Sequence, residues 1–411
     1  MAPPETGAHH RGPSLRWSPW RIVIMFGVTS LFTDLVYEGA RSMYGPLLAS
    51  LGATALVVGL VTGLGEAAAL GLRVVFGPLT DRTGRYWAVT IAGYALTIVS
   101  VPLLAVTPFL GAAGLAAAAA LILLERTGKA IRSPAKTALL AQFAQKVGRG
   151  RGFGVHKAMD QIGAFGGPLL VAAVISATGA MWTGLAALAV PGAIALVVLF
   201  ATRAQTPEPG AAPPGTAPQK WFAQVTGADL PSAFFWYGGA AALMTGGLVT
   251  FGIIGYHLTV QGLVTPAVVP LVYAGGMLAE AVAALGIGQL YDSVGAKVLY
   301  AVPVLVALVP GLALAPSLAL VLTGVVIWGF AYGVQDSTIK ALVAELVPAP
   351  RRATAYGVFA AIQGGAAVLG GLLAGWLYES SLPALVAVIA AAQVAAAVLL
   401  AVALRKARRA T

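Results

Sequence analysis

Acidic side chains are scarce in this chain, and half of them interrupt long apolar stretches. The 411 residues include 14 acidic ones. Seven of these stand among apolar neighbours: Asp34, Glu38, Glu66, Glu125, Asp160, Glu280 and Asp336. A carboxylate in apolar surroundings is costly unless it meets a cation, faces water or takes up a proton. The seven acids therefore predict buried ion pairs, and reversible protonation is the chemistry that they could perform.

The stretch "LLERTGKAIRSPAKTALLAQ" repeats charges at helical spacing. The intervals i, i+4, i+7 and i+11 put one acid and three bases on one helix face: Glu125, Lys129, Arg132 and Lys136. Arg126 lies about 100° round the helix from Glu125. Lys129 and Arg132 either bind an anionic group, which suits arginine, or pair with acids on neighbouring segments. Lys136 is expected to extend toward the membrane interface.

Three charges share one face of the first apolar segment. Asp34, Glu38 and Arg41 follow the spacing i, i+4, i+7. Asp34 is predicted to be a protonation site or a cation ligand. Glu38 has the same two roles open to it, or it neutralises Arg41 or a base on the fourth segment. Both acids are therefore candidates for proton coupling, and Arg41 is a candidate for the wall of a substrate cavity.

The fifth segment carries a histidine and a carboxylate four residues apart, His156 and Asp160. Histidine titrates near neutral pH, so this pair could relay protons. A structural histidine near the interface is the other interpretation. Asp160 lies deeper and is expected to pair with Arg132 or Lys129. We therefore count Asp160 among the coupling candidates and His156 among the cavity candidates.

The second half of the chain has fewer charges within its apolar segments. Glu280 is isolated in "GGMLAEAVAAL", which makes it a second candidate for proton coupling. Asp336 and Lys340 are four residues apart and could neutralise each other. Gln335 and Gln363 replace charged residues of the first half. Together with Asp336, these two amides are assigned to the substrate cavity.

Composition identifies the elements that must hold these side chains. The chain is 59% hydrophobic and 9% charged, whereas an ordinary soluble domain has about 25% charged residues. Twelve apolar segments reach the roughly 20 residues that a bilayer requires, six on each side of a stretch rich in Pro and Gly. The predicted fold class is an all-α membrane protein with twelve transmembrane helices in two six-helix bundles.

The predicted organisation has five parts. They are a tail at 1–19, a first bundle at 20–203, a linker at 204–228, a second bundle at 229–405 and a tail at 406–411. Lys and Arg gather in the loops after even-numbered spans, which places both termini and the linker in the cytoplasm. The net charge of +11 is attributed to these loops and not to nucleic-acid binding. We expect a monomer in the cytoplasmic membrane, and no signal peptide, since the first 19 residues lack its apolar core.

The two halves repeat each other. "GPLTDRTGRY" aligns with "GQLYDSVGAK", "SPAKTALLA" with "DSTIKALVA", and "GVHKAMDQIGAFGGPLL" with "GVFAAIQGGAAVLGGLL". Because the three matches occur in the same order, the halves are predicted to be related by a pseudo-two-fold axis. A site is then expected near the midplane, between the halves.

The first of these repeats resembles motif A of the major facilitator superfamily. The matching residues are Gly77, Asp81, Arg82, Gly84 and Arg85. In that family the motif acts as a latch on the cytoplasmic side, and the resemblance implies the same role here. Gly77 would allow close helix packing, and Gly84 would relieve a tight turn. The alternative is that these charges only fix the topology. The resemblance covers the whole chain and implies spans 1, 4, 7 and 10 around a central cavity.

Two weaker resemblances bear on coupling. "GAFGGP", from Gly163 to Pro168, is similar to the core of motif C, which the family's antiporters carry, although its trailing glycine pair is absent. A small-residue packing face explains it equally well. "ERTGKAIRS" partly resembles motif B, whose arginine, here Arg126, is tied to proton coupling in the family. The wider stretch looks like a poorly characterised prokaryotic subgroup, which implies no substrate.

The leading hypothesis is a proton-coupled secondary transporter that exports a small organic compound, with anions among the candidates. A divalent metal carrier using Asp34 with Glu38 and His156 with Asp160 is the alternative. A membrane sensor or enzyme on the same scaffold is more remote, because no nucleophile–base pair, phosphate loop or HExxH motif is present. We therefore expect no enzyme and no cofactor, with protons and a small molecule as partners.

Overall fold

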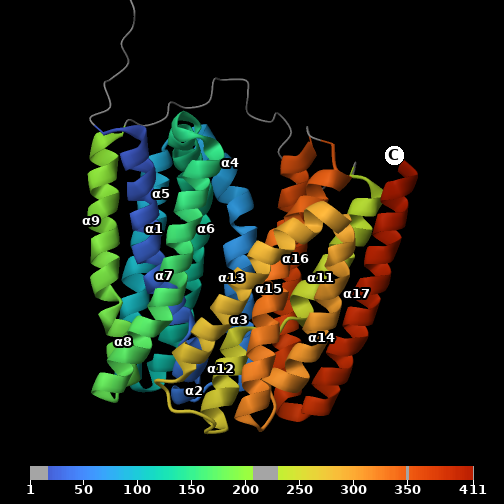
Figure 1. Ribbon diagram of the computed structural model, residues 1–411. Coiled ribbons are helices and arrows are strands. Elements are labelled where there is room, and N and C mark those ends of the chain that lie inside the picture. The colour runs from blue at the N-terminus through green and yellow to red at the C-terminus, as the bar shows by residue number, and fades with distance from the viewer. Residues whose placement is uncertain (1–16, 207–229, 349–350, 411) are drawn as a thin grey trace, which may run out of the picture.

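The computed structural model describes residues 17–206, 230–348 and 351–410. Among these residues, twelve helices are long and apolar enough to cross a membrane. They form two groups that stand side by side, one from each half of the chain (Figure 1). The predicted helical membrane fold and its number of spans are therefore confirmed.

The first group contains more helical elements than spans, because several spans consist of two elements and α2 follows the first span. In chain order its elements are α1 (Pro19–Arg41), α2 (Tyr44–Ser50), α3 (Ala55–Gly71), α4 (Arg73–Thr83), α5 (Tyr86–Leu103), η1 (Leu104–Phe109), η2 (Gly111–Ala113), α6 (Gly114–Val147), α7 (Arg149–Thr178), α8 (Met181–Ala187) and α9 (Ala189–Gln205). The first span is α1 alone, with α2 after it, whereas the pairs α3–α4 and α8–α9 make up the second and sixth spans.

The second group is interrupted mainly at the seventh span. Its elements are α11 (Ser232–Gly247), α12 (Phe251–Val260), α13 (Val269–Val294), η3 (Gly295–Tyr300), α14 (Ala301–Ala313), α15 (Leu318–Leu346), α16 (Arg352–Ser380) and α17 (Leu382–Ala410). The pair α11–α12 forms the seventh span, and α17 continues through the residues at 406–410 that the sequence assigned to a tail.

Local sequence explains several helix ends. The side chain of Thr54 accepts a hydrogen bond from the backbone of Val57 and so caps the start of α3. Ser18 does the same for α1, with Pro19 at the first helical position. Gly84 ends α4 with φ of +65°, a left-handed conformation that glycine adopts without strain. The predicted role of Gly84 in a tight turn is confirmed.

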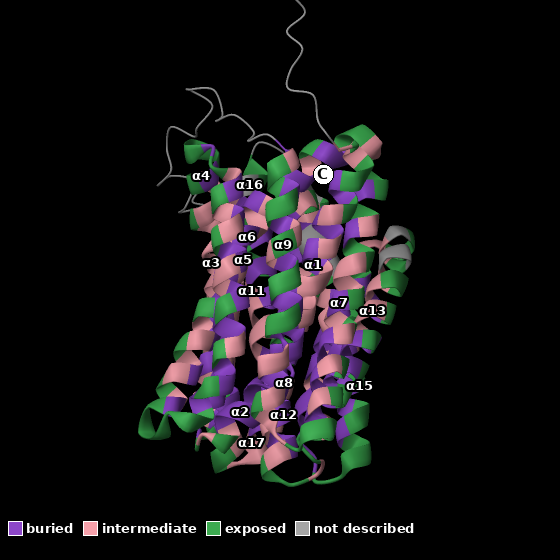
Figure 2. Cartoon of the chain, turned by 90° about the vertical axis from the view of Figure 1, so that its left-hand side faces the viewer, coloured by how far each residue is buried: buried purple, intermediate pink, exposed green. Residues whose placement is uncertain are grey.

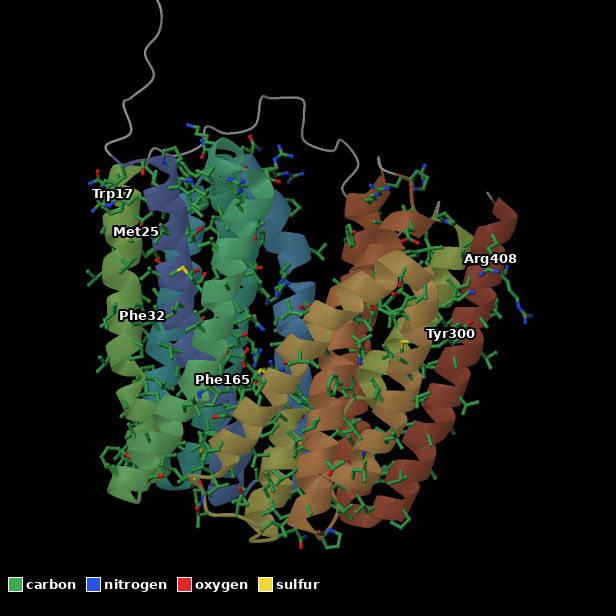
Figure 3. All side chains as sticks on the ribbon, in the orientation of Figure 1. Trp17, Met25, Phe32, Phe165, Tyr300 and Arg408 are labelled. Atoms are coloured by element: carbon green, nitrogen blue, oxygen red, sulfur yellow. The ribbon has the colours of Figure 1, made fainter. Side chains whose placement is uncertain are left out.

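Apolar side chains cover the outer faces of the bundle. Val190 and Val197 of α9 are 65% and 69% exposed, and Leu369 of α16 is 69% exposed. Figure 2 shows such exposed residues along the outward face of α9, with buried residues behind them. This pattern fits a surface solvated by lipid chains. Trp17 and Arg408, near the two ends of the chain, lie at the same end of the molecule (Figure 3).

The halves meet on the side opposite the termini. A Cβ added to Gly59 of α3 would collide with the backbone of Gly371 of α16, and one on Gly45 of α2 with the backbone of Gly252 of α12. Small residues of this kind let two helix backbones approach closely. The elements α2 and α12 lie where the two groups converge in Figure 1. The molecule is therefore closed on that side.

Candidate functional site

A cavity lies between the halves and takes its wall from both. Its empty volume is about 950 Å³. The charged, amide and aromatic residues of its wall are Arg41, Glu66, Trp328, Tyr332, Gln335, Asp336 and Gln363. A smaller pocket of about 300 Å³ shares Arg41 and Glu66 and extends to Arg126 and Tyr44. Four of the residues that the sequence assigned to a cavity, Arg41, Gln335, Asp336 and Gln363, thus share one wall.

The break in the seventh span lines this cavity. Residues Leu248, Val249 and Thr250 separate α11 from α12 and all three contribute to the wall. The carbonyl of Val249 accepts a hydrogen bond of 2.9 Å from the indole nitrogen of Trp328. Non-helical backbone at membrane depth is tolerated where it lines a cavity. Sequence reasoning missed this break, although the glycine pair in "TGGLVT" is a helix-weakening signal.

A buried ionic network connects the first, second and fourth spans. Arg41 donates to Glu66 at 2.6 Å. Arg126 lies 3.5 Å from the same carboxylate and 3.2 Å from Glu125. Tyr44 donates to Glu125 at 3.0 Å. Glu66 therefore neutralises two arginines, and it is a partner that the sequence analysis did not assign to the site, although it recognised Glu66 as an acid within a span.

Glu38 joins this network to the second half of the protein. Its carboxylate accepts a hydrogen bond from the hydroxyl of Tyr273 on α13. Arg41 is 3.9 Å from Glu38, which is farther than its contact with Glu66. Glu38 is only 4% exposed, so the bond is largely shielded from water. The expectation that Glu38 simply neutralises Arg41 is therefore incomplete, because Glu38 also forms an inter-half contact.

A second polar group lies nearer the termini and links the first, fourth and fifth spans. His156 Nδ1 is 3.5 Å from Asp160 Oδ2, and His156 Nε2 is 2.9 Å from Ser30 Oγ. Lys136 donates to the same Ser30 at 3.1 Å. The expected pairing of Asp160 with Arg132 or Lys129 is wrong, since its partner is His156. Lys136 does not extend toward the interface, because its ammonium reaches inward.

Asp34 stands beside this second group without a direct partner. Within the described residues its carboxyl makes no hydrogen bond and no ion pair. The charged groups that act on it most strongly are Asp160, Lys136, Arg132 and Lys129. Two carboxyl groups this close repel each other when both are ionised, so a shared proton relieves the repulsion. The geometry therefore makes Asp34 and Asp160 a candidate proton-binding pair.

The two remaining bases of the fourth span contact neutral side chains. Arg132 donates to Thr97 at 2.7 Å and lies 5.0 Å from the centre of the Tyr94 ring. Lys129 donates to the hydroxyl of Tyr37 at 2.8 Å. Neither residue lines the two cavities described above, and His156 does not line them either. An anion bound at the Lys129–Arg132 stripe would therefore lie outside these cavities.

In the second half, polar groups of the cavity are spread over three helices. Gln363 of α16 donates to Thr245 of α11 at 3.2 Å. Gln335 and Asp336 lie on α15, and the nitrogen of the Gln335 amide has no hydrogen-bond partner among the described residues. The predicted pairing of Asp336 with Lys340 concerns a side chain, Lys340, that lies outside the described residues. Glu280 packs its backbone against glycines of α15, and its role in coupling stays a prediction.

Arg73 on α4 is an intramembrane cation that the sequence analysis passed over. Its side chain is partly buried, and within the part of the chain that the structure describes its Nε has no hydrogen-bond partner. Asp336, Arg132 and Glu66 act on its guanidinium electrostatically. Arg73 is the only charge between Glu66 and Asp81 in the sequence, and this position within an apolar segment is the signal that could have identified it.

The motif A residues lie at the end of the second span, on the terminal side. Asp81 accepts a hydrogen bond of 2.9 Å from Tyr86, within the same half. Arg82 and Arg85 are exposed, and no ion pair among the described residues joins them to the second half. A Cβ on Gly77 would meet only Pro134, at 3.8 Å, so close helix packing does not explain this glycine here.

The motif C residues pack the fifth span against the first. A Cβ on Gly163 or Gly167 of α7 would collide with the backbone carbonyls of Leu31 or Leu35 on α1. These glycines therefore allow the close α1–α7 contact that holds Asp34 beside Asp160. For the metal-carrier alternative, the described residues hold no group of three or more His, Asp or Glu side chains that could bind a metal ion.

Comparison with known proteins agrees with this architecture. The family model described as Major Facilitator Superfamily matches residues 26–264 and 260–411. An uncharacterized protein of Mycobacterium tuberculosis is 48% identical over 391 residues, which cover 93% of each chain. An uncharacterized transporter of the same superfamily from Methanocaldococcus jannaschii is 26% identical over 376 residues, covering 87% of this chain and 89% of the relative.

Solved structures share the fold at low identity. A variant of the nucleoside transporter NupG superposes with a TM-score of 0.76 at 14% identity, covering 93% of this chain and 99% of that one. A variant of the peptide transporter POT gives 0.74 at 16% identity, covering 94% and 95%. The twelve-span architecture and the family match together define a membrane transporter. The chain belongs to the major facilitator superfamily.

Proposed function

We propose that this transporter exports a small organic molecule across the cytoplasmic membrane in exchange for protons, by alternating access. The observation that carries the proposal is the position of the Asp34–Asp160 pair. Asp160 lies on α7, and Asp34 lies on α1 one helical turn from Glu38 and two from Arg41. Glu38 contacts the second half, and Arg41 lines the cavity. A proton bound at the pair can therefore influence the cavity electrostatically.

The orientation of the molecule follows from its loop charges. Lys and Arg are concentrated at the ends of the spans on the terminal side, which supports a cytoplasmic position for that side. The closed side would then face outward, and the cavity would receive its substrate from the cytoplasmic side. Exposed Arg82 and Arg85 fit this state, since a cytoplasmic latch would be disengaged in it.

The cavity wall favours a polar or zwitterionic substrate over a simple anion. Arg41 is paired with Glu66 at 2.6 Å, and Asp336 adds a second carboxylate to the wall. Tyr332 stacks on the buried Trp328 with 5.6 Å between ring centres and offers a flat apolar surface to the cavity. A small molecule with a planar part and groups of both charges would satisfy this wall. Export is supported by the motif C resemblance at Gly163 to Pro168.

The test is transport in proteoliposomes with an imposed pH gradient. Candidate compounds would first be selected by their stabilisation of the purified protein against heat. The wild type should move a selected compound against its gradient when protons flow the other way. Asp34→Asn should still bind the compound but lose gradient-driven transport, whereas Lys146→Met, at an exposed base on the terminal end of α6, should not. Full proton-driven transport by Asp34→Asn contradicts the coupling role.

A further inference from the structure

Lys129 lies between the two polar groups of the first half, which are the ionic network around Glu66 and the group around Ser30, and it is not a full member of either. Its ammonium donates to Tyr37 at 2.8 Å and lies 4.0 Å from the centre of that ring. No carboxylate of the described residues lies within 4.0 Å of its nitrogen. An ammonium group has three donors and is costly to bury without an acid. Lys129 is therefore a half-buried cation without a carboxylate partner among the described residues.

Carboxyl groups lie on either side of this ammonium along α1. Asp34 precedes Tyr37 by three residues and Glu38 follows it by one, so the two acids are a helical turn apart. Lys129 acts electrostatically on both of them. The four-carbon stem of lysine is flexible, and Tyr37, which holds the ammonium, stands on α1 between the two acids. The position of Lys129 is thus suited to a cation that is shared between Asp34 and Glu38.

The charge of the Lys129 ammonium can act on the second half through the Glu38 carboxylate. Its carboxylate holds the hydroxyl of Tyr273 on α13, across the boundary between the halves. A hydrogen bond to a charged acceptor is stronger than one between neutral groups. If an ammonium approaches Glu38, it competes with the Tyr273 hydroxyl for the carboxylate and weakens the bond between the halves.

We propose that Lys129 couples protonation of Asp34 to the contact between the halves by moving between Asp34 and Glu38. The proposal rests on the proton-coupled function proposed above. When Asp34 is ionised, it attracts the ammonium, and Glu38 keeps its full charge for Tyr273. When Asp34 takes up a proton, the ammonium is released to Glu38, the Tyr273 bond weakens, and the closed side can open.

Other ionisable groups surround Lys129, Asp34 and Glu38 and contribute to the electric field that acts on them. Those on the first span are Tyr37 and Arg41, and those on the other elements packed around it are Glu66, Arg73, Tyr94, Glu125, Arg126, Arg132, Lys136, His156, Asp160, Tyr273 and Glu280. Most of these have direct partners: Arg41, Glu66, Glu125 and Arg126 in the ionic network, and Lys136, His156 and Asp160 around Ser30. Among the described residues Lys129, Arg132, Lys136 and Arg73 make no ion pair with a carboxylate. Of these cations, Lys129 is the one whose hydrogen-bond partner, Tyr37, stands on α1 between Asp34 and Glu38, so it can move between the two acids without breaking an ion pair.

The experiment measures conformation and needs no substrate. The chain contains no cysteine, so pairs of cysteines for spin labelling can be introduced without first removing any natural cysteine. One labelled pair, Gln145→Cys with Lys297→Cys, reports on the terminal side, and another, Ser176→Cys with Ser317→Cys, reports on the closed side; all four positions are exposed. Distances between labels are measured in lipid nanodiscs over a range of pH.

Lowering the pH should lengthen the Ser176–Ser317 distance and shorten the Gln145–Lys297 distance in the wild type. Lys129→Met should lose this pH response and stay closed, because Glu38 then keeps Tyr273 at every pH. Asp34→Asn should lose the pH response and keep the closed side open at every pH. Tyr273→Phe should have a larger open population than the wild type. Lys129→Arg should restore part of the response, whereas Lys146→Met, which removes an exposed positive charge, should leave it unchanged.

A pH response that persists in Lys129→Met overturns the proposal, whichever acid produces it. So does a wild type that keeps one conformation at every pH. The result is separable from the proposed function. If Asp34→Asn retains proton-driven transport, the proposed function fails. If proton-driven transport depends on Asp34 but the pH response does not depend on Lys129, only this inference fails.

Discussion

The carboxylate of Glu379, near the end of α16, accepts a hydrogen bond from the backbone nitrogen of Ala55, the first residue of α3. The bond joins the two halves on the closed side. The first backbone N–H groups of a helix have no partner within it, and the helix dipole favours a negative charge there. Glu379 therefore acts as a helix cap supplied by the opposite half, and it adds to the glycine contacts between α3 and α16.

Removing this cap should favour opening of the closed side. Glu379→Ala loses an interaction that helix capping values at about 1–2 kcal/mol, a factor of roughly 5–30 in a conformational equilibrium. The Ser176–Ser317 label pair should therefore show a larger open population. Ser380→Ala is the matched control, since the Ser380 hydroxyl bonds only within α16. An unchanged distance distribution in Glu379→Ala would show that the cap does not hold the halves together.

The contact between Gly59 and Gly371 should also be sensitive to the size of the side chain at position 59. A Cβ on Gly59 collides with the backbone of Gly371, which cannot move aside as a flexible side chain would. Gly59→Ala should therefore disfavour the closed side and speed maleimide labelling of a cysteine placed at Thr62, in the smaller pocket. On the same helix, a Cβ on Gly71 meets nothing within 4 Å, so Gly71→Ala should label at the wild-type rate. Equal rates in the two variants would contradict the steric argument.

The sequence predicts the spans well because each is a long apolar run between basic or glycine-containing loops. The internal repeat likewise predicts two halves with a site between them, and the cavity wall includes Arg41, Gln335 and Gln363 as expected. Lipid imposes these features span by span, so they can be recognised without knowledge of tertiary contacts. The break after Gly247 could not be recognised in this way, because a glycine pair occurs in many unbroken spans.

Partner choice within the ionic network was largely beyond the sequence. Helical spacing correctly put Lys129, Arg132 and Lys136 on one face, but it does not say which neighbouring helix each base meets. That depends on the rotation and depth of helices brought close by Gly163 and Gly167. Asp160 pairs with His156 one turn away on its own helix, as their spacing allows, whereas a tertiary contact turns Lys136 inward to Ser30.

Neutralising Glu66 should destabilise the first half. Glu66→Gln leaves Arg41 and Arg126 with a weaker partner, and breaking a fully buried pair costs about 3–5 kcal/mol. The cost here should be smaller, because the Glu66 side chain keeps 24% exposure. Thermal unfolding in detergent should show a clear loss of stability. Glu345→Gln, which affects a hydrogen bond with Tyr291 near the surface, should change it little. Equal stabilities of the two variants would mean that Glu66 is not a structural centre of the network.

Trp328 should control the order of the break in the seventh span. Its indole nitrogen donates to the carbonyl of Val249, and the side chain is 1% exposed. Trp328→Phe keeps an aromatic ring beside Tyr332 but removes this donor, at a cost of about 1 kcal/mol. A buried carbonyl left without a partner loosens its segment, so amide hydrogen exchange should accelerate over residues 248–251. Trp376→Phe, at a side chain that is 57% exposed on α16, should leave this exchange unchanged. Wild-type exchange rates in Trp328→Phe would show that packing alone orders the break and that the Val249 carbonyl is free to face a substrate.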